Sequence, residues 1–300
     1  MKTAVCALCG TDDAAVELYP RNFSEADLTA RIFSARRLPD RLHATMLRCQ
    51  RCGLVFSKEV IDPCVLRTLY GESLYTYQDA EPYIRRTYVR YLKRVLPMIS
   101  SAPRPLSYLD VGAGNGFMLL EAKKLGFEHV WGVEPSADAI AQAHPSVREN
   151  MLQGFLSGAL LGGRKFDVMT CFQVLDHCSD PLSFVSQCRE ALKPGGIILC
   201  INHDIASWSA RLLGERCPMI DIEHTFLHTP QTMRQLFASQ GFHTIHVFPI
   251  RNDYPLWYWF SLLPFPVRWK KSMMTRIRRS KAGNMLLPLY AGNLCLIACV

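Results

Sequence analysis

Two short patterns in this 300-residue chain combine residue types and spacings that can bind a ligand or a metal. The first is LDVGAGNG, in which Gly112, Gly114 and Gly116 are spaced as G-x-G-x-G. Glycines at this spacing permit a tight turn and let main-chain amides approach a ligand at the positive end of the following helix. A dinucleotide-binding fingerprint has its third glycine one residue later, where this chain has Phe117, so the pattern disfavours NAD and FAD.

A carboxylate follows this glycine-rich turn where the next strand of an α/β sheet should end. Glu134 closes the apolar run HVWGVE, eighteen residues after Gly116, and is followed by Pro135 and a helical segment. A carboxylate at the tip of that strand can accept hydrogen bonds from both hydroxyl groups of an adenosine ribose. The turn and the acid together therefore predict a site for a ligand that contains adenosine.

The second pattern consists of two Cys-x-x-Cys pairs, Cys6 with Cys9 and Cys49 with Cys52, each followed by glycine. Two intervening residues let one tight turn direct both sulfur atoms at a single ion, and four thiolates make a closed, structural zinc site. We therefore expect a small zinc-ribbon-like module over residues 1–62. Ordinary buried thiols are the alternative, because the two pairs are farther apart than in most zinc ribbons. His43 is a competing ligand, although a lone histidine in a loop is more often solvated.

Composition limits the class of protein. Hydrophobic residues make up 49% of the chain and charged residues 20%, which suits a sizeable core and argues against extensive disorder. The net charge of +8 is concentrated in residues 266–281, which hold seven Lys or Arg residues and no acid, so it does not indicate a broad phosphate-binding face. The N-terminus lacks an apolar run of signal-peptide length, and the cysteines are scattered, so we expect a cytoplasmic protein.

The elements that must position these residues can be followed along the chain. PLSYLDVGAGNGFMLLEAKKLGF has the pattern of a strand, a turn and a helix, and HVWGVEPSADAIAQA that of a strand and a helix. KFDVMTCFQVLDH predicts a further strand, and REALKPGGIILCIN a helix, a turn and another strand. Because strands alternate with helices, we expect a doubly wound α/β sheet that is mainly parallel.

Residues 63–100 are expected to link the zinc module to this sheet and to cap it. Five residues between Tyr83 and Ile99 recur at helical spacing: Ile84, Tyr88, Tyr91, Leu92 and Val95. The tyrosines of YGESLYTYQDAEPY, Tyr77 among them, either cover a ligand pocket or pack at the surface or in the core.

Taken in order, four of these motifs resemble those of the class I S-adenosylmethionine (SAM)-dependent methyltransferases. They are LDVGAGNG, GVEPS, FDVMTCFQVLDHCSDP and LKPGG, and the resemblance extends from about Leu106 to Phe242. It implies a Rossmann-like methyltransferase domain over residues 101–300, with HTIHVFPI and NLCLIACV as an antiparallel pair at the sheet edge. SAM is the implied cofactor.

The resemblance also implies which residues hold SAM. Asp110 and the glycine turn contact its methionine part, Glu134 its ribose, and Phe172 and Gln173 line the methionine side. Gln153 or a group near Phe155 replaces the acid that often contacts adenine. The complete expected set is Tyr77, Asp110, Gly112, Ala113, Gly114, Gly116, Phe117, Glu134, Pro135, Phe155, Phe172 and Gln173.

The acceptor should be deprotonated by a residue beyond the fifth strand. His224 beside Glu223 is the expected base, because imidazole titrates near neutral pH and a carboxylate can hold its tautomer. Structural packing of His224 is the alternative, and we expect structural roles for His177 and His203.

The zinc pairs in front of such a core resemble a bacterial subgroup that includes deoxysugar C-methyltransferases, in which a Y-x-E-H segment supplies a tyrosine and a histidine base. Here Asp221 replaces the tyrosine. We expect O- or C-methylation of a small molecule, namely a sugar or glycoconjugate precursor, free or linked to a nucleotide or lipid. An RNA methyltransferase and a non-catalytic SAM-binding interaction protein are the alternatives. The absence of an Asn/Asp-Pro-Pro-Tyr motif and of an RNA-binding module disfavours nucleic acid.

An insertion at residues 251–292 separates the last two expected strands. It joins the aromatic block DYPLWYWF to the basic block RWKKSMMTRIRRSK. This composition suits either a lid over the active site, which we favour, or peripheral membrane contact through residues 255–281. Pro264 and Pro266 interrupt the apolar run before it is long enough to span a bilayer.

Overall fold

A seven-stranded sheet lies at the centre of the molecule, in a computed structural model that describes residues 2–3, 5–11, 14–24, 27, 29, 32, 41–76, 79–263 and 267–300. Its strand order is β12-β15-β10-β9-β6-β7-β8. All neighbouring strands from β10 to β8 are parallel, whereas β15 runs antiparallel to both β10 and β12. The strands are β6 (Ser107–Val111), β7 (His129–Glu134), β8 (Met151–Gln153), β9 (Phe166–Phe172), β10 (Leu192–His203), β12 (His243–Pro249) and β15 (Asn293–Cys299). This confirms the expected doubly wound, mainly parallel sheet with an antiparallel last strand.

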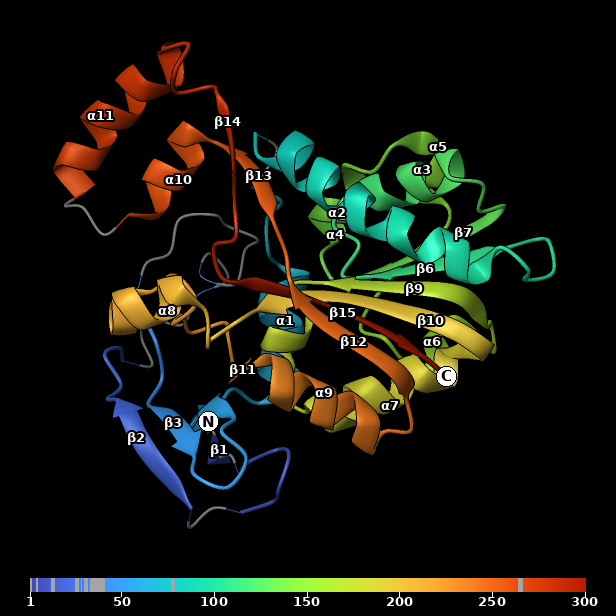
Figure 1. Cartoon of the computed structure of the whole chain (residues 1–300), viewed down its shortest axis with the longest axis horizontal. Helices are drawn as coiled ribbons and strands as arrows, with labels where there is room; N and C mark the ends of the chain where they lie inside the picture. The colour runs from blue at the N-terminus through green and yellow to red at the C-terminus, as the bar shows by residue number, and fades with distance from the viewer. Residues whose placement is uncertain are drawn as a thin grey trace.

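Helices cover both faces of this sheet (Figure 1). One face carries α2 (Glu81–Val95), α3 (Phe117–Lys124), α4 (Ala137–Ala141) and α5 (Pro145–Arg148), and the other carries α6 (Gly158–Leu161), α7 (Pro181–Ala191) and α9 (Pro230–Ser239). Because successive side chains of a strand point to opposite faces, Tyr108 and Leu109 of β6 belong to two separate apolar clusters. The sheet is therefore buried on both sides, and its strand ends are left to form the site.

The segment expected to be a linker helix is α2, which is followed by the 3-10 turn η2 (Leu96–Ile99). All five of its periodic apolar residues are buried, which confirms the helix. It packs on α3 and on β13 (Asn252–Pro255), and Asp253 forms an ion pair with Arg90. The helix thus covers the central sheet, whereas the domain boundaries at residues 63–100 stay a prediction.

A second sheet joins the N-terminal region to a distant part of the chain. Its strand order is β11-β4-β3-β2, with all pairs antiparallel. Three strands are N-terminal and the fourth comes from the second half of the chain: β2 (Ala15–Tyr19), β3 (Met46–Cys49), β4 (Val55–Ser57) and β11 (Phe226–Leu227). Next to it, β1 (Lys2–Thr3) pairs with β5 (Glu59–Val60), and α1 (Pro63–Gly71) follows.

The expectation that His43 is solvated is wrong. Its ring is fully buried, with Nδ1 2.9 Å from the carbonyl oxygen of Ala44 and Nε2 3.2 Å from a carboxylate oxygen of Glu215. The ring therefore contacts the turn η4 (Gly214–Arg216), which follows α8 (Trp208–Leu213), from the side of the N-terminal sheet. The histidine therefore helps to join the two parts of the chain and is not a member of the cysteine cluster.

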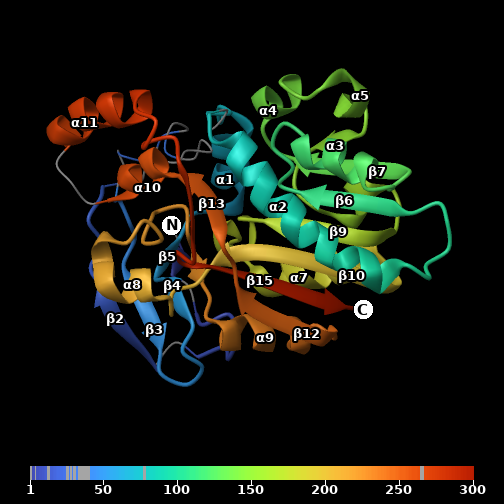
Figure 2. The same ribbon diagram turned by 45° about the horizontal axis from the view of Figure 1, so that its top comes forward.

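The 251–292 insertion forms an antiparallel ribbon of β13 and β14 (Leu286–Leu289) that carries α10 (Leu256–Leu262) and α11 (Val267–Arg279). The ribbon holds these two helices away from the central sheet (Figures 1 and 2). Within the residues that the structure describes, no helix combines the length and apolar character needed to cross a bilayer.

Candidate active site

A cavity of about 760 Å³ lies at the carboxyl ends of the parallel strands. Small-molecule sites in proteins have volumes of roughly 300–1,000 Å³, so this volume suits a ligand site. Both Glu223 and His224 line it, together with ten of the expected SAM contacts: Asp110, Gly112, Ala113, Gly114, Phe117, Glu134, Pro135, Phe155, Phe172 and Gln173. Gly116 is not part of the lining, and Tyr77 lies outside the described residues. The fold thus brings most of the expected set into one place.

The glycine turn connects β6 to α3 and needs glycine for two reasons. Gly112 has a φ of 73°, in the left-handed region that other residues rarely adopt. A Cβ atom on Gly112 would lie 2.3 Å from Cγ2 of Val174, which is closer than atoms can approach. The amides of Gly112 and Ala113 both donate to the carbonyl oxygen of Val133, which ties the turn to β7. Glycine at this position therefore leaves room for the side chain of Val174.

Glu134, the last residue of β7, stabilises the glycine turn through hydrogen bonds. Its two carboxylate oxygens accept hydrogen bonds from the amides of Gly114 at 2.8 Å and Ser136 at 2.9 Å. Burial raises the pKa of this carboxyl group. Each oxygen keeps a further lone pair, so the same carboxylate can still accept hydrogen bonds from the hydroxyl groups of a ribose.

Two buried polar groups lie on the other side of the turn. Burial raises the pKa of Asp110 to about 7, although the hydroxyl of Thr170 donates a hydrogen bond to its carboxylate at 2.6 Å. A cation placed in the cavity would favour its ionised form. Gln173 has a φ of 57°, and its buried Oε1 has no hydrogen-bond partner among the described residues. A buried acceptor without a partner is what a polar ligand contact leaves behind.

On the far side of the cavity, β10 ends in a histidine that is held by a buried aspartate. Asp176, in the turn η3 (Leu175–His177), places Oδ2 2.8 Å from Nδ1 of His203 and 2.9 Å from the amide nitrogen of His203. Burial opposes ionisation of Asp176, but the hydrogen bonds from the ring and the main-chain amide of His203 lower the pKa of Asp176 to about 2. Because an ionised carboxylate can only accept, Nδ1 of His203 is the donor in this hydrogen bond, and in the neutral ring Nε2 then presents a lone pair. His203 lines the cavity with its side chain 20% exposed.

Two further histidines surround His203. The ring of His224 lies 4.5 Å from that of His203 and 4.9 Å from that of His177, between centroids. Nδ1 of His224 lies 2.9 Å from the carbonyl oxygen of Met219. This carbonyl, and not the carboxylate of Glu223, is therefore the group that orients the ring of His224. Burial lowers the pKa of His224. His177 has its Nδ1 2.8 Å from the hydroxyl of Tyr70, on α1.

The sequence analysis did not predict the pairing of His203 with Asp176, and it expected a structural role for His203. One signal was present: Asp176 follows the carboxyl end of β9 and His203 is the last residue of β10, and these two strands are parallel neighbours. Polar residues at neighbouring strand ends meet at the same edge of a sheet. The catalytic roles of Glu223 and His224 stay predictions.

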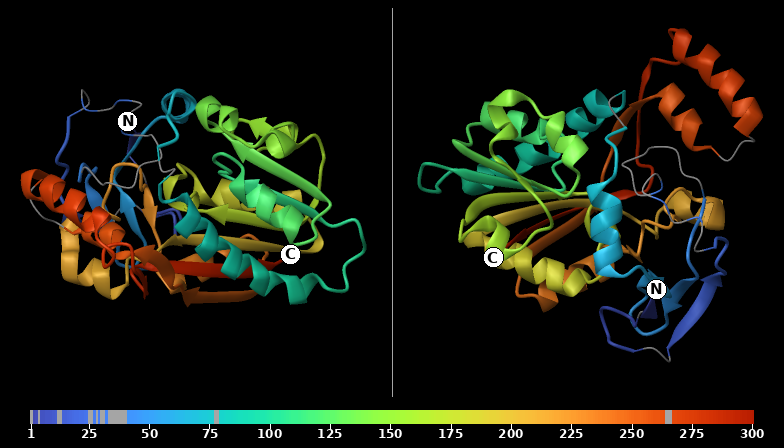
Figure 3. Two further views of the ribbon diagram at one scale, coloured as in Figure 1. Left: turned by 90° about the horizontal axis from the view of Figure 1, so that it is seen from above. Right: turned by 180° about the vertical axis from the view of Figure 1, so that it is seen from behind.

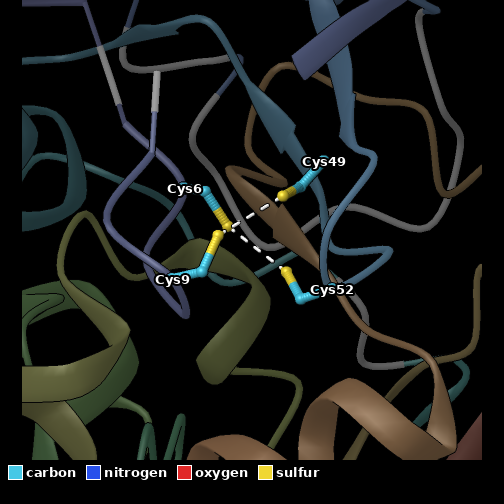
Figure 4. Close-up of side chains that lie close together, drawn as sticks. All are labelled: Cys6, Cys9, Cys49 and Cys52. Atoms are coloured by element: carbon cyan, nitrogen blue, oxygen red, sulfur yellow. Dashed lines mark hydrogen bonds between the residues drawn. The ribbon is translucent and has the colours of Figure 1, made fainter. Parts of the chain in front are cut away.

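The four cysteines of the N-terminal pattern converge, although residues 10–48 separate the two pairs in the sequence (Figure 4). Their sulfur atoms all lie within 4.8 Å of one another, with Cys6 3.4 Å from Cys52 and Cys9 3.4 Å from Cys49. Thiolates around one zinc ion lie roughly 3.8 Å apart, given Zn–S bonds of about 2.3 Å. The donor set and its spacing fit a tetrahedral zinc ion, and zinc itself stays a prediction.

Comparisons with known proteins found similar sequences and folds. The curated relatives include the ubiquinone biosynthesis O-methyltransferase of Cereibacter sphaeroides, 31% identical over 128 residues, which are 38% of this chain and 50% of the relative. The protein of that name from Histophilus somni is 33% identical over 118 residues, 35% and 49% of the two chains. The chain thus spans about half the length of the curated relatives it matches. A SAM-dependent methyltransferase structure from Archaeoglobus fulgidus aligns at 16% identity with a TM-score of 0.49, over 75% of this chain and 99% of that chain.

The match that assigns the chain to a family is to a family profile. The profile described as a methyltransferase domain matches residues 81–247, more than half of the chain. It begins at the first residue of α2 and covers the glycine turn, Glu134 and the Asp176–His203 pair. This chain therefore belongs to the methyltransferase domain family.

Proposed function

We propose that this protein transfers a methyl group from SAM to a hydroxyl oxygen of a small molecule that has an apolar portion. The observation that carries the proposal is that one cavity contains both the glycine turn with Glu134 and the Asp176–His203 pair. The first group suits a nucleoside with an amino-acid tail, and the second suits the removal of a proton from an acceptor. Two such groups facing one space are what methyl transfer to oxygen requires.

The donor side fits SAM in residue type and charge. The glycine turn admits the main chain of the protein close to the ligand, and Glu134 can accept from the ribose. The unpartnered Oε1 of Gln173 and the carboxyl group of Asp110 suit the ammonium group of the methionine part. SAM supplies an activated methyl group when it is bound, so the protein's task is to position the acceptor and to remove its proton.

The acceptor side offers His203 as the base, in place of the expected His224. Nε2 of His203 can take the proton of an acceptor hydroxyl, while Asp176 holds the ring and stabilises the imidazolium that forms. His224, whose Nδ1 faces the carbonyl of Met219, then acts as a neutral neighbour that orients the acceptor. The relatives' name, O-methyltransferase, also supports an oxygen acceptor.

The walls of the acceptor side favour an apolar acceptor. Aromatic and aliphatic side chains from the insertion and from α8 line this part of the cavity: Trp208, Tyr254, Tyr258, Trp259, Leu262 and Leu289. Within the predicted class of sugars and glycoconjugate precursors, such walls support a lipid-linked compound over a nucleotide-linked one. They also disfavour an RNA acceptor.

The test combines binding with turnover. Calorimetric titration should show tight binding of SAM and none of NAD, and Glu134→Ala should weaken the binding of SAM. Methyl transfer from labelled SAM is then measured against hydroxyl acceptors that share a head group but carry lipid, phenyl or nucleotide substituents. We expect the apolar members to be methylated. Binding of NAD in place of SAM, or SAM binding without transfer to any hydroxyl acceptor, would contradict the proposal.

A further inference from the structure

Large exposed hydrophobic side chains gather on one side of the molecule. Thirteen such side chains are exposed in the described part of the chain, and seven of them lie between residues 208 and 290: Trp208, Leu212, Leu256, Leu263, Met273, Met285 and Tyr290. They come from α8, α10, α11 and the ends of β14, and the three helices lie on the same side in every view (Figures 1, 2 and 3). Single exposed hydrophobic residues are normal, but a group drawn from several segments indicates a binding surface.

Positive charge lies on the same elements. The sequence has no Asp or Glu after Asp253, and it has seven Lys or Arg residues between positions 268 and 281. Asp253 itself is buried and paired with Arg90, so it does not offset these charges at the surface. Arg276, Arg279 and Lys281 are exposed, as are Arg211 and Arg216 around α8. The α8/α10/α11 surface therefore combines exposed apolar groups with cations.

Internal contacts hold the insertion in place. The indole nitrogen of Trp259 donates to the carbonyl oxygen of Leu287 at 2.7 Å, and the rings of Tyr254 and Tyr258 stack with centroids 3.9 Å apart. The guanidinium of Arg278 lies 4.2 Å from the ring centroid of Trp257. The indole nitrogen of Trp208 in turn donates to the carbonyl oxygen of Tyr290 at 2.6 Å, which joins α8 to the end of the ribbon. The surface is thus a defined arrangement of helices that are connected to one another.

The cavity is continuous with this surface. Trp208 and Leu213 of α8, Leu262 and Leu263 at the end of α10, and Leu289 of β14 all line the cavity. Trp208 and Leu263 are also among the exposed hydrophobic residues. An apolar path therefore connects the exposed surface with the acceptor side of the site.

We propose that the α8/α10/α11 surface binds the headgroup region of an anionic bilayer. Tryptophan, tyrosine and aliphatic side chains enter the interface between headgroups and acyl chains, while lysine and arginine attract anionic lipids. A nucleic acid would match the cations but would leave the aliphatic side chains exposed. If the proposed function holds, an acceptor dissolved in the bilayer enters the cavity along the apolar path.

Vesicle sedimentation tests the charge half of the proposal. The full chain is mixed with vesicles of phosphatidylcholine alone or of equal parts phosphatidylcholine and phosphatidylglycerol. We expect binding to the anionic vesicles only, weakened by salt. Arg276→Glu/Arg279→Glu/Lys281→Glu should reduce that binding at least about tenfold. The matched control is Lys93→Glu/Lys123→Glu/Lys165→Glu, which changes charge equally on lysines elsewhere and should bind as the parent does.

A second variant tests the apolar half without changing charge. Leu212→Gln/Met285→Gln alters two of the most exposed side chains, neither of which lines the cavity, and should also weaken vesicle binding. SAM affinity in solution, measured for every variant, confirms folding and is expected to stay constant. Equal binding to both vesicle types, an unaffected charge variant, or binding to RNA but not to vesicles would overturn the proposal. Vesicle binding without SAM binding would instead count against the proposed function alone.

Discussion

Under the proposed function, the cavity has a donor half, with the glycine turn and Glu134, and an acceptor half, with His203 and Asp176. Each half holds one buried carboxyl group whose pKa is strongly shifted, and the two shifts have opposite directions. In the donor half, burial raises the pKa of Asp110 to about 7, and its polar neighbour is the hydroxyl of Thr170. In the acceptor half, Asp176 is also buried, but the hydrogen bonds from the ring and the main-chain amide of His203 lower its pKa to about 2. The donor half is thus prepared to gain a negative charge when a cation binds, whereas the acceptor half already holds one.

The two halves also differ in how the chain builds them. The donor half comes from residues 107–173, where three neighbouring strand ends supply main-chain amides, glycines and two carboxyl groups, those of Asp110 and Glu134. The acceptor half needs side chains from α1, η3, β10, the loop before β11 and the insertion. A contiguous turn can be built by local sequence, but distant side chains meet only through the whole fold.

The largest effect is expected from the Asp176–His203 pair. Asp176→Asn and His203→Gln should each lower the rate of methyl transfer by about 10²- to 10⁴-fold, the usual contribution of a general base. SAM affinity should not change, because the pair lies in the acceptor half. A steady-state kinetic assay and a SAM titration check both statements.

Two comparisons separate a chemical role of His203 from a structural one. Added imidazole should restore part of the activity of His203→Ala, which it would not do for a merely misfolded site. His246→Gln, on the exposed part of β12, is the matched control and should be fully active. If His224→Gln abolishes transfer while His203→Gln does not, the originally expected base is correct.

The second effect concerns stability and pH. The carboxyl group of Asp110 has an ordinary pKa of 3.8 in the unfolded chain and a pKa of about 7 in the folded protein, so its contribution is fully present below pH 3.8. As the pH rises towards 7, the unfolded chain loses this proton and the folded chain keeps it, so stability falls. Asp110→Asn should remove on the order of 3 kcal/mol of this pH dependence.

Denaturant unfolding without ligand, at pH 5 and at pH 8, measures this pH dependence of stability for the parent and for Asp110→Asn. Asp176→Asn is the control and should keep the parent's difference between pH 5 and pH 8, because the stability from the depressed pKa of Asp176 is lost only from pH 3.8 towards pH 2. An equal pH dependence in the parent and in Asp110→Asn would show that Asp110 is ionised in the folded protein.

A third, smaller effect is expected in the donor half. Gly112→Ala introduces a Cβ atom against Val174 and should reduce SAM affinity by about tenfold to a hundredfold, from an overpacking cost of about 1–3 kcal/mol. Gly163→Ala is the matched control, because Gly163 has a similar φ of 79° but nothing within 4 Å of the added atom. Calorimetric titration with SAM compares the two. Equal affinities would mean that the turn does not contact the donor.

The smallest effect tests the link between the cysteine cluster and the acceptor half. β4 pairs with β11, which begins two residues after His224, so loosening the cluster should disturb acceptor binding more than SAM binding. We expect about one zinc ion per chain and, for Cys9→Ser, a modest rise in the KM of the acceptor with little change in SAM affinity. Metal analysis and kinetics check this. A chain without zinc that is fully active would rule out the metal.

Sequence patterns predicted the sheet and the convergence of the glycine turn with Glu134, because both depend on short-range rules, whereas SAM contacts at these residues stay a prediction. Alternation of strand and helix signals gave the parallel core, and the spacing of Gly112, Gly114 and Glu134 indicated a turn and an acid that the structure joins by a hydrogen bond. The cysteine pairs were recognised for the same reason. The partner of His203 was missed because Asp176 lies 27 residues away and looks like any polar residue of a strand end.

By itself, the sequence determined the order of the elements, the glycine turn and the two Cys-x-x-Cys turns, since each depends on residues close together in the chain. Only the tertiary structure decided that His43 is buried, that Phe226–Leu227 completes the N-terminal sheet, and that Asp176 fixes the tautomer of His203. The physical reason is the distance along the sequence between the residues that interact. Backbone conformation and strand spacing are set locally, whereas burial and hydrogen-bond pairing between distant side chains depend on how the whole chain packs.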